Sequence, residues 1–477
     1  MLDRKKFEEE IKRVRAQQVE DLSKFLEGFA DLSNKINEMP VAGVDVEEKL
    51  KEIEKIPFSN KGRDPREVAD ELVKKGFEES MMLQHPKFFS FVTSAVSPYA
   101  LAGAILSDIY NVNTCGFELS PTIAYIEEKL IRWMGGLAGF DDNCGGLFTS
   151  GGSLSNLTGF IAARDNMLTE DEFPIGVAYI SDQTHSSARK GLRMMGLRRD
   201  NIVVIPTDDE YKMRTDLLEE AIQRDIANGK KPFLVVATIG TTNTGSIDPL
   251  QEIGAIKEKY NMWMHIDGAF GGSILFSGIY NHLASGVELA DTLSWDTHKW
   301  AMQGYSSSSL IAKDKKKLIN VFAEHPEYLA DIIDADHTDG WDLGIEMSRP
   351  ARCVKLWFTV QAMGTDLLSD VIDYSFFNSH QAERTLKTLE GWEITSPPMC
   401  GTITFRYAPA GVDPALYDEM NARISDELIK SGFAFMVTTV IKGKRVQRMN
   451  MINGNMNDQD VIDTIHKVDE IAHELYG

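Results

Sequence analysis

The segment DTLSWDTHKW, at residues 291–300, places a lysine in an unusual setting. His298 and Trp300 flank Lys299 directly after a run that is typical of a buried strand. Most lysines lie on the solvated surface. A buried lysine with a lowered pKa, however, is the type that forms Schiff bases with carbonyl compounds. Lys299 is therefore the first candidate for a covalent catalytic residue.

The segment FTSGGSLSN, at residues 148–156, predicts a strand that runs through a glycine turn into a helix. Glycine lets the backbone approach a ligand closely, and the free N–H groups at a helix start attract a phosphate. Gly151 and Gly152 lie at that point. Strand-to-helix turns also use glycine for geometry alone, so this motif indicates phosphate binding only together with other features.

Two further polar residues follow predicted strands. His185 lies beyond GVAYI, and Asp267 ends the apolar run of MWMHIDGAF, where Gly268 and Ala269 leave space beside it. A lone histidine is more often a loop or core residue, and a carboxylate here can simply cap the next helix. Together with Lys299 and the glycine turn, they offer an anion cradle, a stacking imidazole, a carboxylate for a ring nitrogen and an amine for an aldehyde. That combination suits pyridoxal 5'-phosphate (PLP).

The pattern of elements from about Cys144 onward explains why these residues should meet. Short apolar runs alternate with helical patterns, which indicates βαβ units and a largely parallel sheet whose ligands lie at the carboxyl ends of strands. The 32 positions from Asp267 to Lys299 fit one helix and the next strand. After about Lys355, a helical region, the strand-like TITFRYAP, FAFMVTTV and VQRMNMI, and a closing helix from Asn457 indicate a smaller α+β unit.

The first part of the chain has the pattern of a helical arm. Apolar residues recur at helical spacing from Phe7 to about Leu32. Asp64 as N-cap, with Pro65 after it and Glu67 three residues on, predicts the start of another helix. We therefore expect a helical arm at 1–85, a large α/β domain at 86–355 and a small α+β domain at 356–477.

Composition argues against several classes of function. The chain has 477 residues and carries 50 Lys and Arg against 72 Asp and Glu, and the net charge of -22 would repel nucleic acid and anionic membranes. No stretch resembles a signal peptide or a membrane span. The four cysteines are widely spaced and fit neither a zinc site nor a disulfide framework. We expect a cytoplasmic protein without a metal, nucleic-acid or membrane partner.

These motifs resemble those of the group II PLP-dependent amino acid decarboxylases, and the resemblance covers nearly the whole chain. Within that group the chain is most similar to bacterial tryptophan and other aromatic amino acid decarboxylases. The resemblance implies the α/β PLP-dependent transferase fold of aspartate aminotransferase fold type I, with a mostly parallel central sheet. It also implies a homodimer with active sites at the subunit interface and the helical arm packed on the partner.

The resemblance implies roles for individual residues of the cofactor site. Lys299 would form the Schiff base, Asp267 would pair with the pyridinium nitrogen, and His185 would stack on the ring. The other implied cofactor contacts are His298, Gly152 and Ser153 at the phosphate, Ala269 under the ring, and Thr242 in TIGTTNTGS.

On the substrate side, the resemblance assigns Arg448 in VQRMNMI to the substrate carboxylate; the alternative is a surface arginine on a strand. Tyr328 lies in the polar, lid-like segment 323–341 and matches the tyrosine that protonates the substrate carbon. Related aldehyde synthases carry phenylalanine there, so Tyr328 favours amine formation. The side-chain pocket is expected to be lined by Phe91, Asn113, Leu119 and Trp341.

We expect an aromatic substrate, with tryptophan ahead of phenylalanine and tyrosine. A glutamate decarboxylase needs a second cation, because an unpaired buried carboxylate is costly, and the expected pocket segments offer little of that kind. Phe91 and Trp341 suit an aromatic ligand, but both could be core residues, and Asn113 replaces an expected histidine. The alternatives are a glutamate or other decarboxylase of the family, another PLP reaction such as transamination or carbon–sulfur lysis, and a non-catalytic scaffold.

Overall fold

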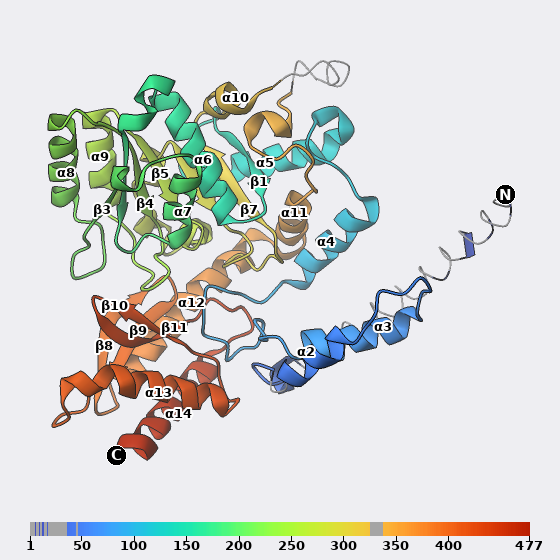
Figure 1. Cartoon of the computed structure of the whole chain (residues 1–477), viewed down its shortest axis with the longest axis vertical. Coiled ribbons are helices and arrows are strands. Elements are labelled where there is room, and N and C mark those ends of the chain that lie inside the picture. Colours follow the sequence, from blue (N-terminus) through green and yellow to red (C-terminus); the bar gives the residue numbers. More distant parts are fainter. Residues whose placement is uncertain are drawn as a thin grey trace.

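The computed structural model describes residues 36–43, 46–324 and 337–477, together with residues 5, 9, 12, 13 and 17 (Figure 1). A seven-stranded sheet in the order β1-β7-β6-β5-β4-β2-β3 forms the centre of the fold. Its strands are β1 (Gly145–Thr149), β2 (Gly176–Ser181), β3 (Ile202–Ile205), β4 (Lys231–Thr238), β5 (Trp263–Asp267), β6 (Thr292–Trp295) and β7 (Ser308–Ala312). Strands β1, β2, β5 and β6 coincide with the strands predicted in FTSGGSLSN, GVAYI, MWMHIDGAF and DTLSWDTHKW.

The sheet is largely parallel, as predicted. Strands β3, β2, β4, β5 and β6 pair in parallel, whereas β7 runs antiparallel to both β6 and β1. Strand β1 therefore points the same way as the parallel strands. The carboxyl ends of β1, β2, β4, β5 and β6 consequently share one edge, where ligands of such sheets bind.

Helices cover both faces of this sheet. In β4, Val235 and Ala237 join one hydrophobic cluster, and Leu234 and Val236 join another, as the alternation of side chains along a strand requires. The first cluster includes α5 (Pro121–Leu137), α8 (Thr215–Ala227) and α9 (Leu250–Tyr260); the second includes α6 (Gly152–Met167), α7 (Ser186–Met194) and α10 (Lys316–Phe322). The result is three layers, helix, sheet and helix.

The connection from β5 to β6 differs from the predicted single helix. It consists of the 3-10 helices Gly271–Phe276, Asn281–Ala284 and Val287–Leu289. Its first turn is tied to the sheet edge, because the Gly271 N–H donates to the Ile239 carbonyl over 2.9 Å. A Cβ on Gly271 would lie 2.5 Å from that oxygen, so the glycines serve close approach and not a regular helix.

The C-terminal part forms an antiparallel sheet in the order β10-β11-β9-β8. Its strands are β8 (Trp392–Met399), β9 (Thr402–Tyr407), β10 (Thr438–Ile441) and β11 (Lys444–Asn450), and it packs with α12 (Thr365–Leu386), α13 (Tyr417–Lys430) and α14 (Asp458–Tyr476). Strand β8 was not predicted. The strand predicted in FAFMVTTV is longer than β10, because Phe435 instead exchanges backbone hydrogen bonds with Lys87 and Phe89. Asn457 caps α14, as predicted.

Near the N-terminus, α2 (Val46–Glu54) and α3 (Pro65–Leu72) lie apart from the two sheets and contain no buried residue (Figure 1). Asp64 caps α3 as predicted, and its carboxylate accepts from the Arg66 N–H over 2.8 Å. The helix expected from Phe7 lies almost wholly outside the described residues and stays a prediction. Helix α4 (Pro98–Tyr110) then packs against α11 (Cys353–Met363).

The described residues also bear on the expectations about membrane spans and disulfides. No helix within the described ranges is long and apolar enough to cross a membrane. The four cysteines are all buried, and none of them forms a disulfide.

Candidate active site

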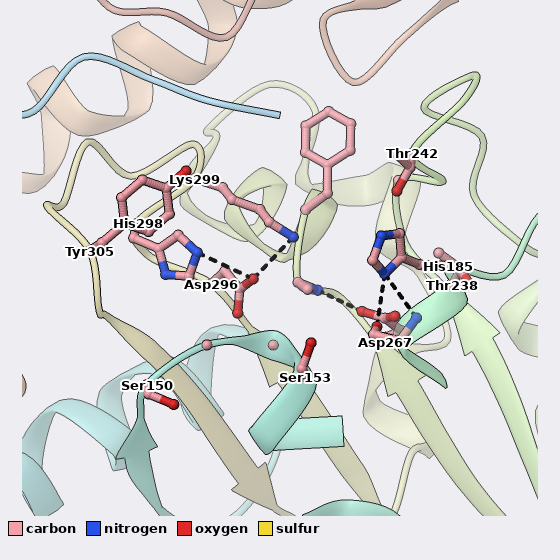
Figure 2. A pocket seen from close by; sticks show the side chains of 16 residues that line it. Ser150, Ser153, His185, Thr238, Thr242, Asp267, Asp296, His298, Lys299 and Tyr305 are labelled. Carbon is pink, nitrogen blue, oxygen red and sulfur yellow. Dashed lines mark hydrogen bonds and ion pairs between the residues drawn. The ribbon is translucent and has the colours of Figure 1, made fainter. Parts of the chain in front are cut away.

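A cavity of about 260 Å³ opens at the carboxyl edge of the larger sheet (Figure 2). It is lined by every residue that sequence analysis assigned to the cofactor: Gly152, Ser153, His185, Thr242, Asp267, Ala269, His298 and Lys299. It is also lined by residues that the analysis did not single out, among them Ser150, Thr238, Asp296 and Tyr305. The order of the strands therefore brings together segments that are far apart in the sequence.

The glycine turn after β1 forms one wall of the cavity. A Cβ on Gly152 would lie 2.8 Å from the Asp296 carboxylate and 2.9 Å from the Ala269 methyl group, so a side chain does not fit there. Helix α6 starts at Gly152 without a side-chain cap on its first N–H groups. An uncapped helix start with Ser153 beside it can hold a phosphate.

Asp267, at the end of β5, is a buried carboxylate with three donors. Its Oδ2 accepts from the Asn156 amide over 3.0 Å, and its Oδ1 accepts from the Ala269 N–H over 3.1 Å and the Ser294 hydroxyl over 3.4 Å. These donors fix the Asp267 carboxylate at the edge of the cavity, where it can pair with a protonated ring nitrogen.

A chain of hydrogen bonds behind Asp267 has a fixed direction. Because Asp267 only accepts, Asn156 turns its amide N–H toward Asp267 and its Oδ1 toward His265 Nε2, which lies 2.9 Å away. His265 Nε2 therefore carries the proton, and Nδ1 accepts from the Thr292 hydroxyl over 2.8 Å; Thr292 in turn accepts from Trp263 Nε1 over 2.9 Å. Burial lowers the pKa of His265 to about 3, so the ring is neutral.

Lys299 lies on a turn after β6, and Figure 2 shows its amino group directed at Asp296. Lys299 Nζ is 3.0 Å from Asp296 Oδ2. Burial lowers the pKa of Lys299, but the charges of Asp296 and Asp267 and the hydrogen bond to Asp296 together raise it by more, so the net shift is upward. The expectation of a lowered pKa is therefore wrong, because sequence analysis overlooked the carboxylate three residues earlier.

Two histidines border the cavity with defined protonation. His185 caps α7, and its Nδ1 accepts from the Ser187 N–H over 3.3 Å, which leaves the ring proton on Nε2. His298 Nδ1 lies 2.7 Å from the Ser307 carbonyl, which can only accept, so Nδ1 carries the proton there. His298 Nε2 can then donate to a phosphate oxygen only when the ring is protonated.

Arg448, on β11, is 5% exposed, so its interpretation as a surface arginine is wrong. Its Nε donates to the Thr242 carbonyl and its Nη1 to the Phe91 carbonyl, each over 2.7 Å. Its Nη2 has no partner among the described residues. Burial lowers the pKa of Arg448 to about 10. The smaller sheet thus holds a buried cation with one unpaired donor against the cavity residue Thr242, although Arg448 itself is not among the described residues that line the cavity.

The other predicted pocket residues do not line this cavity. Asn113 Oδ1 accepts from the Cys115 and Arg349 N–H groups, and Trp341 is buried with its ring against Gly116, as a core residue would be. Leu119 is 49% exposed and Phe91 is 50% exposed. Tyr328 lies outside the described residues.

The donor set fits PLP, since it combines an uncapped helix start, a buried anion and a lysine in one cavity. The family profile for the pyridoxal-dependent decarboxylase conserved domain matches residues 66–408. An aromatic-L-amino-acid decarboxylase of Bacillus atrophaeus is 31% identical over 418 residues, which cover 87% of each chain. A cysteine sulfinic acid decarboxylase of Homo sapiens is 29% identical over 416 residues, covering 85% of this chain and 82% of the relative.

The structural comparison agrees with the sequence comparison. A crystal structure of Oryza sativa TDC with PLP and tryptamine matches with a TM-score of 0.91 and 25% identity, over 97% of this chain and 99% of that chain. The fold expected from the resemblance, PLP-dependent fold type I, is thereby confirmed. The chain belongs to the pyridoxal-dependent decarboxylase family, whose members are PLP-dependent carboxy-lyases.

Proposed function

We propose that this PLP-dependent decarboxylase acts on an aromatic L-amino acid, tryptophan before phenylalanine and tyrosine, and releases the arylalkylamine and CO2. The observation that supports the proposal is the small number of Lys and Arg side chains in or beside the cavity. Lys299 is the only Lys or Arg among the described residues that line the cavity, and Arg448 beside it has one open donor. The substrate α-carboxylate would use that donor, which leaves no cation for an acidic side chain.

We propose the following division of work among the residues of the site. Bound PLP supplies an electron sink for the charge left on the α-carbon when CO2 departs. Lys299 would hold the cofactor covalently, and Asp267 would keep its ring nitrogen protonated. His185 would cover the ring. Arg448 would aim the α-carboxylate, which must stand perpendicular to the ring before it leaves.

We propose Tyr328 as the acid that protonates the α-carbon after CO2 has left. The proposal rests on the resemblance alone, because Tyr328 lies outside the described residues. We expect Tyr328→Phe to bind PLP normally, judged by absorbance, and to lose amine product. Amine formation at the wild-type rate would assign this step to another acid.

We propose that the enzyme is a homodimer in which Leu119 reaches the partner subunit's cavity. Large apolar side chains are exposed along one stretch of the described chain, on α4 and beyond it: Tyr99, Leu106, Ile109, Tyr110, Leu119 and Tyr125. Several exposed large apolar side chains close together in the chain would suit a protein interface. A second copy on that surface would explain why Leu119 does not line the active-site cavity formed by the described residues of its own chain.

Two experiments test the proposed function. Borohydride reduction of the yellow holoenzyme, followed by peptide mapping, should place the label on Lys299; a label on another lysine would refute that assignment. The values of kcat/KM for tryptophan, tyrosine, phenylalanine, histidine, glutamate, cysteine sulfinate and 2,4-diaminobutyrate should then be compared under one set of conditions. A preference for any of the last four would overturn the aromatic proposal and leave the decarboxylase assignment intact.

A further inference from the structure

Asp296 is a buried carboxylate that the assigned roles do not use. It is 2% exposed and lines the cavity between the glycine turn and Lys299. Its Oδ2 lies 3.0 Å from Lys299 Nζ and 3.6 Å from His298 Nε2, and its Oδ1 has no hydrogen-bond partner among the described residues. Burying a carboxylate costs several kcal/mol unless a charge compensates it. Lys299 is the cation within hydrogen-bond distance.

We propose that Asp296 is the resident counter-ion of Lys299, which keeps the lysine as an ammonium ion inside the cavity whenever it is not joined to the cofactor. The inference rests on the proposed covalent role of Lys299. In this view Asp296 is a positioning residue, because it acts through the lysine and not on the substrate.

The turn after β6 provides the geometry for this pair. Lys299 stands three residues after Asp296, and the Lys299 N–H donates to the Asp296 carbonyl over 3.2 Å. This turn places both side chains on the cavity side, where Figure 2 shows them together. A lysine released from the cofactor therefore meets its counter-ion without a backbone movement.

The other groups that act on Lys299 are less suited to this role. Asp267, on β5, already accepts three hydrogen bonds. Tyr305, on the following loop, is neutral at pH 7 because burial raises its pKa. His298 is held by Ser307, and His185 by Ser187 at the start of α7. Asp296 alone in this set combines contact with Lys299 and a free acceptor atom.

The test measures the titration of Lys299 in the full-length chain after removal of the cofactor. Competitive dinitrophenylation across a pH series, read by peptide mass spectrometry, gives the pH at which Lys299 becomes reactive. Without the Asp296 carboxylate, burial still disfavours the ammonium form of Lys299, and the more distant Asp267 is the main charge left to oppose it. We expect Asp296→Asn to lower the midpoint by about one pH unit or more, and Asp296→Glu to restore most of the shift.

Asp225→Asn is the matched control, because Asp225 is also a buried carboxylate, bonded to the Tyr179 hydroxyl away from the cavity. It should leave the Lys299 midpoint unchanged. Circular dichroism checks folding, and Asp296→Ser replaces Asp296→Asn if that variant does not fold. An unchanged midpoint in a folded, uncharged variant overturns the proposal. The borohydride label on Lys299 is a separate measurement, so failure of the covalent role and failure of the ion pair are distinguishable.

Discussion

The polar side chains near β5 and those near β11 differ in how completely their hydrogen bonds are satisfied. On the β5 side, both oxygens of Asp267 accept hydrogen bonds, and the chain behind it continues through His265 to Trp263 without a missing partner. On the β11 side, two nitrogens of Arg448 donate hydrogen bonds to backbone carbonyls, and Nη2 has no partner among the described residues. The first arrangement is complete within the chain, whereas the second is not.

This difference separates a preorganised group from one that awaits a ligand. An unsatisfied buried donor costs about 1–3 kcal/mol, which is tolerable where a bound ligand supplies the missing acceptor. A satisfied network holds its members at fixed positions before any ligand arrives. Substitutions on the β5 side should therefore affect the cofactor and every substrate alike, and those on the β11 side should affect mainly the substrate.

The largest effect is expected at Asp267. Asp267→Asn keeps the shape but loses the charge, and its new N–H group must oppose one of the donors from Asn156 or Ala269. We expect kcat to fall about a thousandfold for all substrates. Measured kcat, cofactor content and the absorbance of the bound cofactor check this. If only one substrate is affected, the role at the ring nitrogen is wrong.

Arg448 should give the next largest effect. Arg448→Met removes the open donor, and we expect kcat/KM to fall about a hundredfold while PLP absorbance is retained. Arg448→Lys keeps a charge but cannot hold both carbonyls and a carboxylate, so it should recover only part of the activity. If both Arg448 variants also lose the cofactor, Arg448 affects cofactor binding as the β5 side does, and the proposed difference between the β5 and β11 sides is wrong.

The β5 side was the more predictable from sequence, and for a physical reason. Asp267 ends one strand and Lys299 follows the next, each within a short motif, and the order of parallel strands is enough to bring them together. Asp296 was missed although its three-residue spacing to Lys299 was visible. No sequence pattern around Asn156 indicated its contact with Asp267, because only the packing of α6 on the sheet turns its amide toward that carboxylate.

The substrate side depends on contacts that no local pattern reveals. Arg448 is linked to the cavity by its hydrogen bond to the carbonyl of the cavity residue Thr242, 206 positions away in the sequence. Trp341 and Leu119 are both apolar in the sequence, yet the first is core and the second is exposed. The arm from Phe7, the Tyr328 segment and the domain boundaries stay predictions.

His265 offers a test through pH. Burial holds its pKa near 3 in the folded chain, so below about pH 6.5 only the unfolded chain takes up its proton. The free energy of unfolding should therefore fall, by about 1.4 kcal/mol for each pH unit from 6.5 toward 3. His265→Gln keeps a donor for Asn156 but does not titrate. We expect its thermal midpoint to drop less between pH 7 and pH 5 than that of the wild type. Equal drops would mean that His265 is not held neutral.

The smallest effect is expected at Leu119. Its side chain is half exposed in the single chain and is proposed to contact the substrate in the partner's cavity, so Leu119→Ala should change the thermal midpoint little and lower kcat/KM for tryptophan about tenfold. Leu416→Ala is the matched control, because Leu416 is also a leucine with 49% exposure, at the end of the 3-10 helix Pro414–Leu416. It should change neither quantity.

Mixed dimers decide which subunit's cavity Leu119 serves. A Lys299→Ala subunit is inactive in its own cavity but still carries Leu119. If Leu119 reaches across the interface, pairing that subunit with a Leu119→Ala subunit rebuilds one complete site, and the kcat/KM per active site returns to the wild-type value. If Leu119 acts in its own subunit, the one active site lacks it and kcat/KM stays low. A kcat/KM that stays low would show that Leu119 acts only in its own subunit, and it would contradict the proposal that Leu119 contributes to the partner's active site. Equal behaviour of Leu119→Ala and Leu416→Ala would show that Leu119 is ordinary surface.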